Sequence, residues 1–418
     1  MKTIKKIAKK CLLVCGSLLL CLQFAWAGIP VQQWTLPNGA QINLVESHAI
    51  PMVDIQIDFD AGSRRDPTHQ AGLASVTAGM AGKGLSGKGA TGKGGEPMDE
   101  NALGEAWADL GASFGASAGS DRMSFSLRSL TEPDLLAKAL ALASRQMAEP
   151  AFAPTVWERE RQRLIASLAE SARRPATVAA KAFAKAVYGQ HPYGMEMTEA
   201  SLNAITVADM QALYQRHILP CRAKASIVGK LTRAQAQNAV EVLLAGLPAK
   251  SGLCSPLPSV PEVSALTQAQ DSALPFDSAQ AHVLIGQPGF KREDPDFFPL
   301  TVGNYILGGG GFVSRLTTEV REKRGLSYSV YSYFSPGLHA GAFTLGLQTR
   351  PDQAQQAVAV AKQVVADFVA NGPTEDELKA AKDNLVGGFA LMIDTNRKLL
   401  GNIANMAWNG LPLNYLDT

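Results

Sequence analysis

The sequence has few cysteines, few charged residues and, beyond its first 27 residues, no long apolar run. No two of the five cysteines form a CxxC pair, which excludes a zinc ribbon and a thioredoxin-like redox motif. Only 18% of the residues are charged whereas 46% are hydrophobic, a composition that excludes a disordered chain. At 418 residues, the chain is long enough for two or three folded domains.

The first 27 residues predict a secretory signal peptide. A lysine-rich head is followed by an apolar run from Cys11 to Trp26, which is too short for a membrane anchor. The run ends in Ala25-Trp26-Ala27, a small-x-small cleavage site before Gly28. We therefore expect a secreted chain with no membrane span after cleavage.

Removal of the signal peptide changes the charge and the cysteine content. The signal peptide contains five lysines and no acidic residue, so its removal lowers the net charge from +2 to −3. Without a basic surplus to neutralise phosphates, nucleic acid is excluded as a ligand. Only Cys221 and Cys254 remain. An oxidising compartment permits a disulfide between them, and two free thiols are the alternative.

An internal repeat predicts two homologous domains. Residues 124–134 (SFSLRSLTEPD) and 342–352 (AFTLGLQTRPD) match without a gap at Phe, Leu, Thr, Pro and Asp. Alternating apolar residues indicate a strand, and Pro-Asp indicates the start of the next helix. In both copies an alanine-rich helix follows, and then Pro-Thr opens another helix. We expect an α+β protein of two tandem domains, each an antiparallel sheet packed with helices.

The predicted domains are residues 28–246 and 278–418, separated by a linker at 247–277 that is rich in Pro, Ser and Ala. In the first domain, a helix at 208–216 and a strand at 223–228 complete the pattern. The second copy has six residues after Leu411-Pro412. We therefore expect it to lack counterparts of this helix and strand, as a fragment would.

Four segments carry a resemblance to a known family: LPNGAQINLV (36–45), DAGSRRDP (60–67), GLASVTAGM (72–80) and ILGGGGFVSRLTTEVREKRGLSYSV (306–330). Together with the tandem domains and the signal peptide, they resemble the bacterial two-domain branch of the pitrilysin/insulinase-type (M16) zinc peptidases. The resemblance covers essentially the whole mature chain. It implies a periplasmic location and a chamber that closes when the chain pairs with a partner subunit.

The zinc-binding residues of active members are absent. In those members the segment equivalent to GLASVTAGM carries His-x-x-Glu-His on a helix, where two imidazoles at i and i+4 share a metal and the glutamate is the general base. Ser75, Ala78 and Gly79 occupy these positions, and the position of the third ligand, a later glutamate, falls on Ser167. The six histidines are scattered without ligand spacing. We therefore expect no metal on this chain.

A second motif of the family is retained. In active relatives, R-x-x-x-G-L-x-Y places an arginine and a tyrosine opposite the zinc, and Arg321, Gly325, Leu326 and Tyr328 match it. Arg321 would bind a peptide carbonyl or carboxylate, and Tyr328 would donate a hydrogen bond to the developing oxyanion. The alternative is that Arg321 caps a helix C-terminus and Tyr328 faces the core.

A glycine run precedes this motif, formed by Gly308, Gly309, Gly310 and Gly311. It lacks the frame of a phosphate-binding loop. A flexible or close-packed turn is one interpretation, and contact with an incoming peptide, as in non-catalytic relatives, is the other.

These features predict the non-catalytic subunit of a periplasmic heterodimer. A zinc-bearing M16 subunit would be its partner and unfolded peptides its substrate, with Arg321 and Tyr328 acting in trans. The alternative is a peptide-binding or structural protein with the same fold that cleaves nothing.

Overall fold

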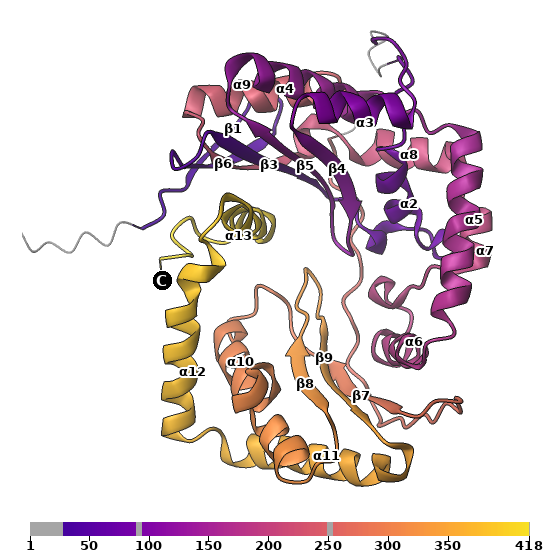
Figure 1. Ribbon diagram of the computed structural model, residues 1–418, viewed down its shortest axis with the longest axis vertical. Helices are drawn as coiled ribbons and strands as arrows, with labels where there is room; N and C mark the ends of the chain where they lie inside the picture. The colour runs from indigo at the N-terminus through magenta and orange to yellow at the C-terminus, as the bar shows by residue number, and fades with distance from the viewer. Residues whose placement is uncertain (1–27, 89–93, 249–253, 418) are drawn as a thin grey trace, which may run out of the picture.

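The structure is a computed structural model that describes residues 28–88, 94–248 and 254–417, so the predicted signal peptide lies outside the described residues. It is a mixed α+β protein with two sheets on opposite sides of the molecule (Figure 1). Within the described part of the chain, no helix combines the length and apolarity needed to cross a membrane.

The first sheet has six strands in the order β1-β2-β6-β3-β5-β4. Their bounds are β1 (Gln32–Thr35), β2 (Gln41–Glu46), β3 (Met52–Phe59), β4 (Ser113–Ala118), β5 (Met123–Leu130) and β6 (Lys224–Gly229). The expected antiparallel pairing holds for every neighbouring pair except β2 and β6, which are parallel. β6 returns after a long helical excursion, and that length permits a parallel crossover.

Eight helices accompany this sheet among the described residues. They are α2 (Leu73–Met80), α3 (Glu100–Asp109), α4 (Pro133–Ala148), α5 (Pro154–Ser171), α6 (Pro175–Tyr188), α7 (Glu199–Ala204), α8 (Val207–His217) and α9 (Arg233–Leu244). Proline at the first position starts α4, α5 and α6, where its missing N–H costs nothing. α8 and β6 confirm the helix and strand expected at 208–216 and 223–228.

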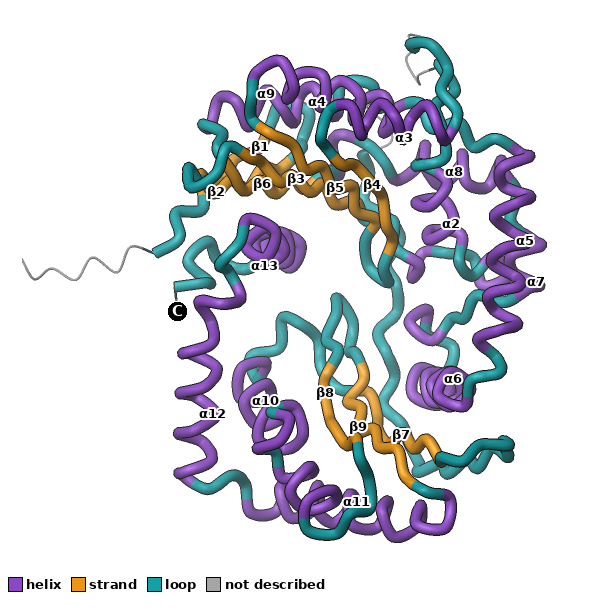
Figure 2. Tube along the Cα trace, viewed as in Figure 1, coloured by secondary structure: helices purple, strands orange, loops and turns teal. Residues whose placement is uncertain are grey.

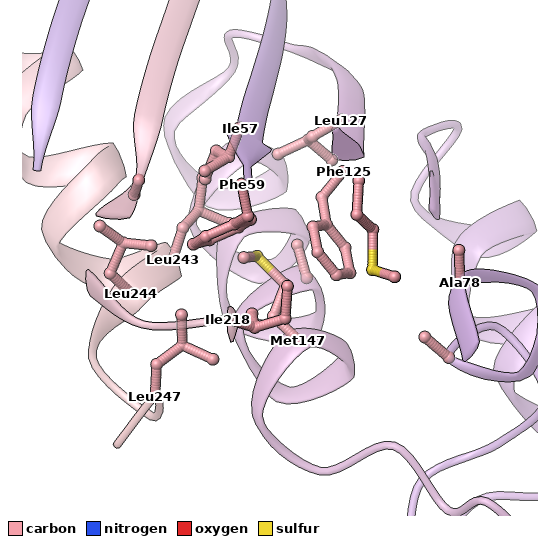
Figure 3. Close-up of a cluster of buried hydrophobic side chains, with 14 of the residues drawn as sticks. Ile57, Phe59, Ala78, Phe125, Leu127, Met147, Ile218, Leu243, Leu244 and Leu247 are labelled. Atoms are coloured by element: carbon pink, nitrogen blue, oxygen red, sulfur yellow. The ribbon is translucent and has the colours of Figure 1, made fainter. Parts of the chain in front are cut away.

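The main core lies between the first sheet and α4 and α9. Phe59 on β3 and Phe125 on β5 are fully buried and meet edge to face, with ring centres 5.8 Å apart (Figure 3). Met147 of α4 and Leu243 of α9 close the same cluster from the helical side. The period-two alternation of β5 therefore places its apolar side chains in one layer.

The second sheet has three strands, β7 (Ala281–Pro288), β8 (Ser329–Phe334) and β9 (Ala342–Thr349), in the order β7-β9-β8. It is accompanied by α10 (Phe297–Asn304), α11 (Ala354–Asn371), α12 (Glu375–Gly388) and α13 (Asn396–Asn409). The order repeats β3-β5-β4 of the first half. Ile55 pairs with Leu127 just as Ile285 pairs with Leu345, so the repeat seen in the sequence is also a repeat of strand register.

The two halves exchange one helix each. α13, from the second half, lies on the face of the first sheet that points away from α4 and α9 (Figure 2). There Ile403 packs with Val228, and Lys224 donates hydrogen bonds to the carbonyls of Ala407 and Trp408. Its counterpart α6, from the first half, packs on β7 of the second sheet. The halves are thus joined by reciprocal packing as well as by the linker.

Cys221 and Cys254 form a disulfide, which decides between the two alternatives left by the sequence. Cys221 precedes β6, and Cys254 lies in the segment predicted as a linker. Between α9 and β7 the described residues contain neither a helix nor a strand. The disulfide therefore ties the start of this extended segment to the first half.

Candidate functional site

Arg321 contacts two exposed aromatic rings. It belongs to a π-helical turn, η7 (Thr317–Glu322), and its guanidinium carbon is 4.5 Å from the ring centre of Tyr328 and 4.8 Å from that of Phe312. Tyr328 is 81% exposed and Phe312 is 68% exposed. The alternative that Tyr328 faces the core is therefore wrong. The structure brings Arg321 and Tyr328 together, as the motif spacing requires.

The guanidinium of Arg321 keeps its hydrogen-bond donors available. Among the described residues, no carboxylate or carbonyl lies within bonding distance of it, which also argues against a helix-capping role. Its neighbours differ: Arg315 makes a two-pronged ion pair with Glu377, at 2.7 and 2.6 Å, and Arg324 pairs with Glu319 at 2.6 Å. The two ring contacts use none of its N–H donors in a hydrogen bond, so its planar fork is free for an external acceptor.

The ion pair beside the site is firmly charged. Hydrogen bonding from Arg315 is the main cause that lowers the pKa of Glu377 to about 2. Arg315 also donates to the carbonyl of Gly372, 3.0 Å away. These bonds hold the residues just before η7 against the region where α11 ends and α12 begins. Arg315 is thus structural, and Arg321 is the cation left for a ligand.

The glycine run forms a close-packed turn. A Cβ on Gly308 would lie 2.6 Å from the backbone nitrogen of Ser332 on β8, which leaves no room for a side chain. Gly311 has a φ of +62°, a conformation that favours glycine. Gly309 and Gly310 pack closely beside the end of α10 and the π-helical turn after it. The turn fixes where Phe312 stands, while contact of the run with a peptide stays a prediction.

The positions of the lost zinc motif cannot hold a metal. Ser75 and Gly79 lie on the same exposed face of α2, and Ser167 is exposed on α5. Ala78, at the position of the general base, is 2% exposed and belongs to the main core (Figure 3). Two neutral hydroxyls cannot replace two imidazoles and a carboxylate as zinc ligands. No three His, Cys, Asp or Glu residues form a metal-binding group elsewhere in the described ranges.

A polar cluster between the two halves was not foreseen from the sequence. The rings of His191 and His339 lie 5.1 Å apart. The hydroxyl of Tyr193 donates to Asp121, at 2.6 Å, and accepts the backbone N–H of His339 at 3.2 Å. Burial is the first cause that lowers the pKa of His191 and raises that of Tyr193. Because its members come from distant segments, no local spacing predicts this cluster, which fastens one half to the other.

Comparison with known proteins identifies the family. The family model described as "Insulinase (Peptidase family M16)" matches residues 42–201, and the model described as "Peptidase M16 inactive domain" matches 204–385. A crystal structure of a peptidase M16 inactive domain from Pseudomonas fluorescens superposes with a TM-score of 0.85 at 32% identity, covering 93% of this chain and 90% of that one. The chain belongs to the M16 peptidase family.

Other M16 relatives carry two kinds of name. A non-peptidase homolog from Helicobacter pylori is 26% identical over 390 residues, which cover 91% of this chain and 85% of that protein. An uncharacterized zinc protease from Streptomyces coelicolor is 28% identical over 258 residues. These residues cover 60% of this chain and 55% of that protein, so this chain spans about half of its length. The periplasmic protease PqqL from Escherichia coli shares the fold, with a TM-score of 0.73 at 19% identity, and this chain spans 42% of it. With its ligand positions substituted, this chain is an inactive M16 homologue.

Proposed function

We propose that this chain is the non-catalytic subunit of a periplasmic, heterodimeric M16 peptidase. The observation that carries the proposal is the unpaired guanidinium of Arg321, in contact with the exposed rings of Phe312 and Tyr328. A free planar fork suits a peptide carbonyl or carboxylate, and a phenol suits an oxyanion. Neither group can hydrolyse a peptide bond without an activated water.

Within this proposal the two subunits divide the chemistry. A zinc held by the partner would supply the Lewis acid that activates water. Arg321 orients the peptide by binding one of its oxygens, and Tyr328 donates a hydrogen bond to the scissile carbonyl oxygen as negative charge develops there. Ser75, Ala78 and Gly79 take no part, because their side chains neither ligate a metal nor accept a proton.

Two further observations support the pairing and the location. This chain spans 42% of PqqL, so a segment of this fold can form less than half of a longer protease. The basic head and apolar run of residues 1–27 support export to the periplasm.

A second candidate is peptide binding without cleavage. The same geometry favours it, because Phe312, Arg321 and Tyr328 all belong to this chain and their contacts require no metal. In that case unfolded peptides would bind to the isolated chain with an affinity that depends on Arg321.

Hydrolysis of an unstructured peptide by a zinc-bearing M16 relative, measured with and without this chain, tests the proposal. We expect the chain to raise the rate, and Arg321→Ala and Tyr328→Phe to abolish most of the increase. Matched controls are Arg324→Ala, which removes an exposed arginine already paired with Glu319, and Tyr333→Phe on β8.

The outcomes separate the two candidates. If the chain leaves the rate unchanged, or if both site variants stimulate as well as the parent, the trans-acting role is wrong. Peptide binding by the isolated chain that disappears in Arg321→Ala, with no effect on the partner, would favour the second candidate. A stoichiometric zinc in the purified chain that chelators remove, together with unaided hydrolysis, would contradict both.

A further inference from the structure

We infer that Phe312 is a positioning residue that, together with Tyr328, forms an aromatic clamp on Arg321. The inference rests on the proposed function, because the clamp orients the arginine that binds the peptide. The guanidinium carbon lies 4.8 Å from the ring centre of Phe312 and 4.5 Å from that of Tyr328.

Phe312 is not part of the hydrophobic core. Its side chain is 68% exposed, and it belongs to none of the buried clusters of the described residues. A large ring left in solvent contributes little to folding, so its contact with Arg321 is the interaction that this position provides. Val313 beside it is also exposed, at 75%, but makes no such contact with Arg321.

The segment that carries Phe312 has a fixed conformation. Gly311 takes a positive φ, and its carbonyl accepts two hydrogen bonds from Ser314, from the backbone N–H at 3.1 Å and from Oγ at 2.8 Å. Ser314 is completely buried, and its Oγ lies 3.1 Å from the hydroxyl oxygen of Thr317. On the other side, the N–H of Gly310 donates to the carbonyl of Tyr305 at 2.7 Å. The ring is therefore held at the tip of an anchored turn.

The clamp sets the direction from which a ligand can bind. Because neither ring accepts a hydrogen bond from it, the guanidinium keeps its in-plane N–H donors for a ligand on the side that the two rings leave open. A planar oxygen acceptor, such as a carboxylate or a peptide carbonyl, fits this edge-on approach. A lysine at position 321 would not reproduce it, because an ammonium group has no plane for the rings to orient.

Variants at position 312 test the inference. Phe312→Leu keeps an apolar side chain but removes the ring, Phe312→Tyr keeps the ring, and Val313→Ala is the control in the same turn. The first readout is the Nε–Hε resonance of Arg321 in the isolated chain labelled with ¹⁵N-arginine, assigned by its disappearance in Arg321→Lys. The second readout is kcat/KM for peptide hydrolysis by the zinc-bearing relative in the presence of each variant.

We expect Phe312→Leu to lose the ring-current shift of Arg321 Hε and to lower the stimulated kcat/KM about two- to fivefold, as the loss of one cation–π contact predicts. Phe312→Tyr should retain both the ring-current shift and the stimulated kcat/KM, and Val313→Ala should match the parent in both measurements. If Phe312→Leu leaves the resonance or the stimulation unchanged, the clamp is wrong. If the parent chain does not stimulate at all but the resonance and the Arg321-dependent peptide affinity respond as expected, the clamp stands and the trans-acting function fails.

Discussion

Replacement of Tyr193 by phenylalanine tests whether the polar cluster between the halves holds them together. The hydroxyl donates to Asp121 at 2.6 Å and accepts the N–H of His339, which belongs to the loop between β8 and β9. A hydrogen bond to a charged group contributes about 1.5–3 kcal/mol. Asp121 would keep its ion pair with Arg64, at 3.4 Å, and its bond from the N–H of Leu338, at 3.1 Å. Tyr193→Phe should therefore lower the free energy of unfolding by an amount near the lower end of this range, about 2 kcal/mol.

This magnitude converts into a measurable change in melting temperature. At about 2.1 cal/mol/K per residue, a chain of roughly 390 residues that unfolds cooperatively has an unfolding entropy near 0.8 kcal/mol/K. A loss of about 2 kcal/mol then lowers Tm by about 2–3 °C in scanning calorimetry. Tyr333→Phe is the matched control, because Tyr333 is 46% exposed and its hydroxyl has no hydrogen-bond partner among the described residues.

Hydrogen exchange gives a local readout of the same bond. In Tyr193→Phe the amide of His339 loses its acceptor and should exchange faster, whereas the amide of Leu338 keeps its bond to Asp121. If Tm changes no more than in Tyr333→Phe and the His339 amide keeps its protection, the hydroxyl of Tyr193 does not fasten the halves.

Three further perturbations have defined outcomes. Burial lowers the pKa of His217 to about 4, below its ordinary 6.5, so as pH falls the unfolded chain binds a proton at this residue before the folded chain does. The folded state should therefore lose up to about 3 kcal/mol of stability between pH 6.5 and 4 through His217. In urea titrations, His217→Asn should abolish this part of the loss. Gly308→Ala should destabilise the protein by about 1–3 kcal/mol because the new methyl group meets the backbone of Ser332. Gly401→Ala in α13 is the control, because a Cβ there meets nothing within 4 Å. In thermal unfolding scans this control should not be destabilised. The double variant Cys221→Ser, Cys254→Ser should lose about 3–4 kcal/mol, and dithiothreitol should lower the Tm of the parent alone.

Local signals in the sequence were enough to predict much of the fold. The alternating segment at 124–134 contains most of the strand β5, and its Pro-Asp starts α4. Such patterns depend on residues that are close in sequence, so they predict helices and strands without knowledge of the tertiary structure. The parallel pairing of β2 with β6 and the exchange of α6 and α13 depend on contacts between distant segments, for which a single sequence has no signal.

The candidate site divides in the same way. The spacing of Arg321 and Tyr328 on a retained motif predicted that they act together, and the structure places them in contact. Phe312 was missed because its position after a glycine run does not predict which side chain it contacts; that contact exists only once the turn is folded. The meeting of His191 with His339 could not be predicted either, since it requires the two halves to be docked.

The exchange of α6 and α13 bears on how such a protein can change over evolutionary time. Phe183 of α6 touches Gly286 of β7, and Ile403 of α13 packs with Val228 of β6, so mutations on either side of the linker must remain compatible with each other. If the gene were divided between the halves, both of these packing surfaces would be left uncovered unless the two products associated.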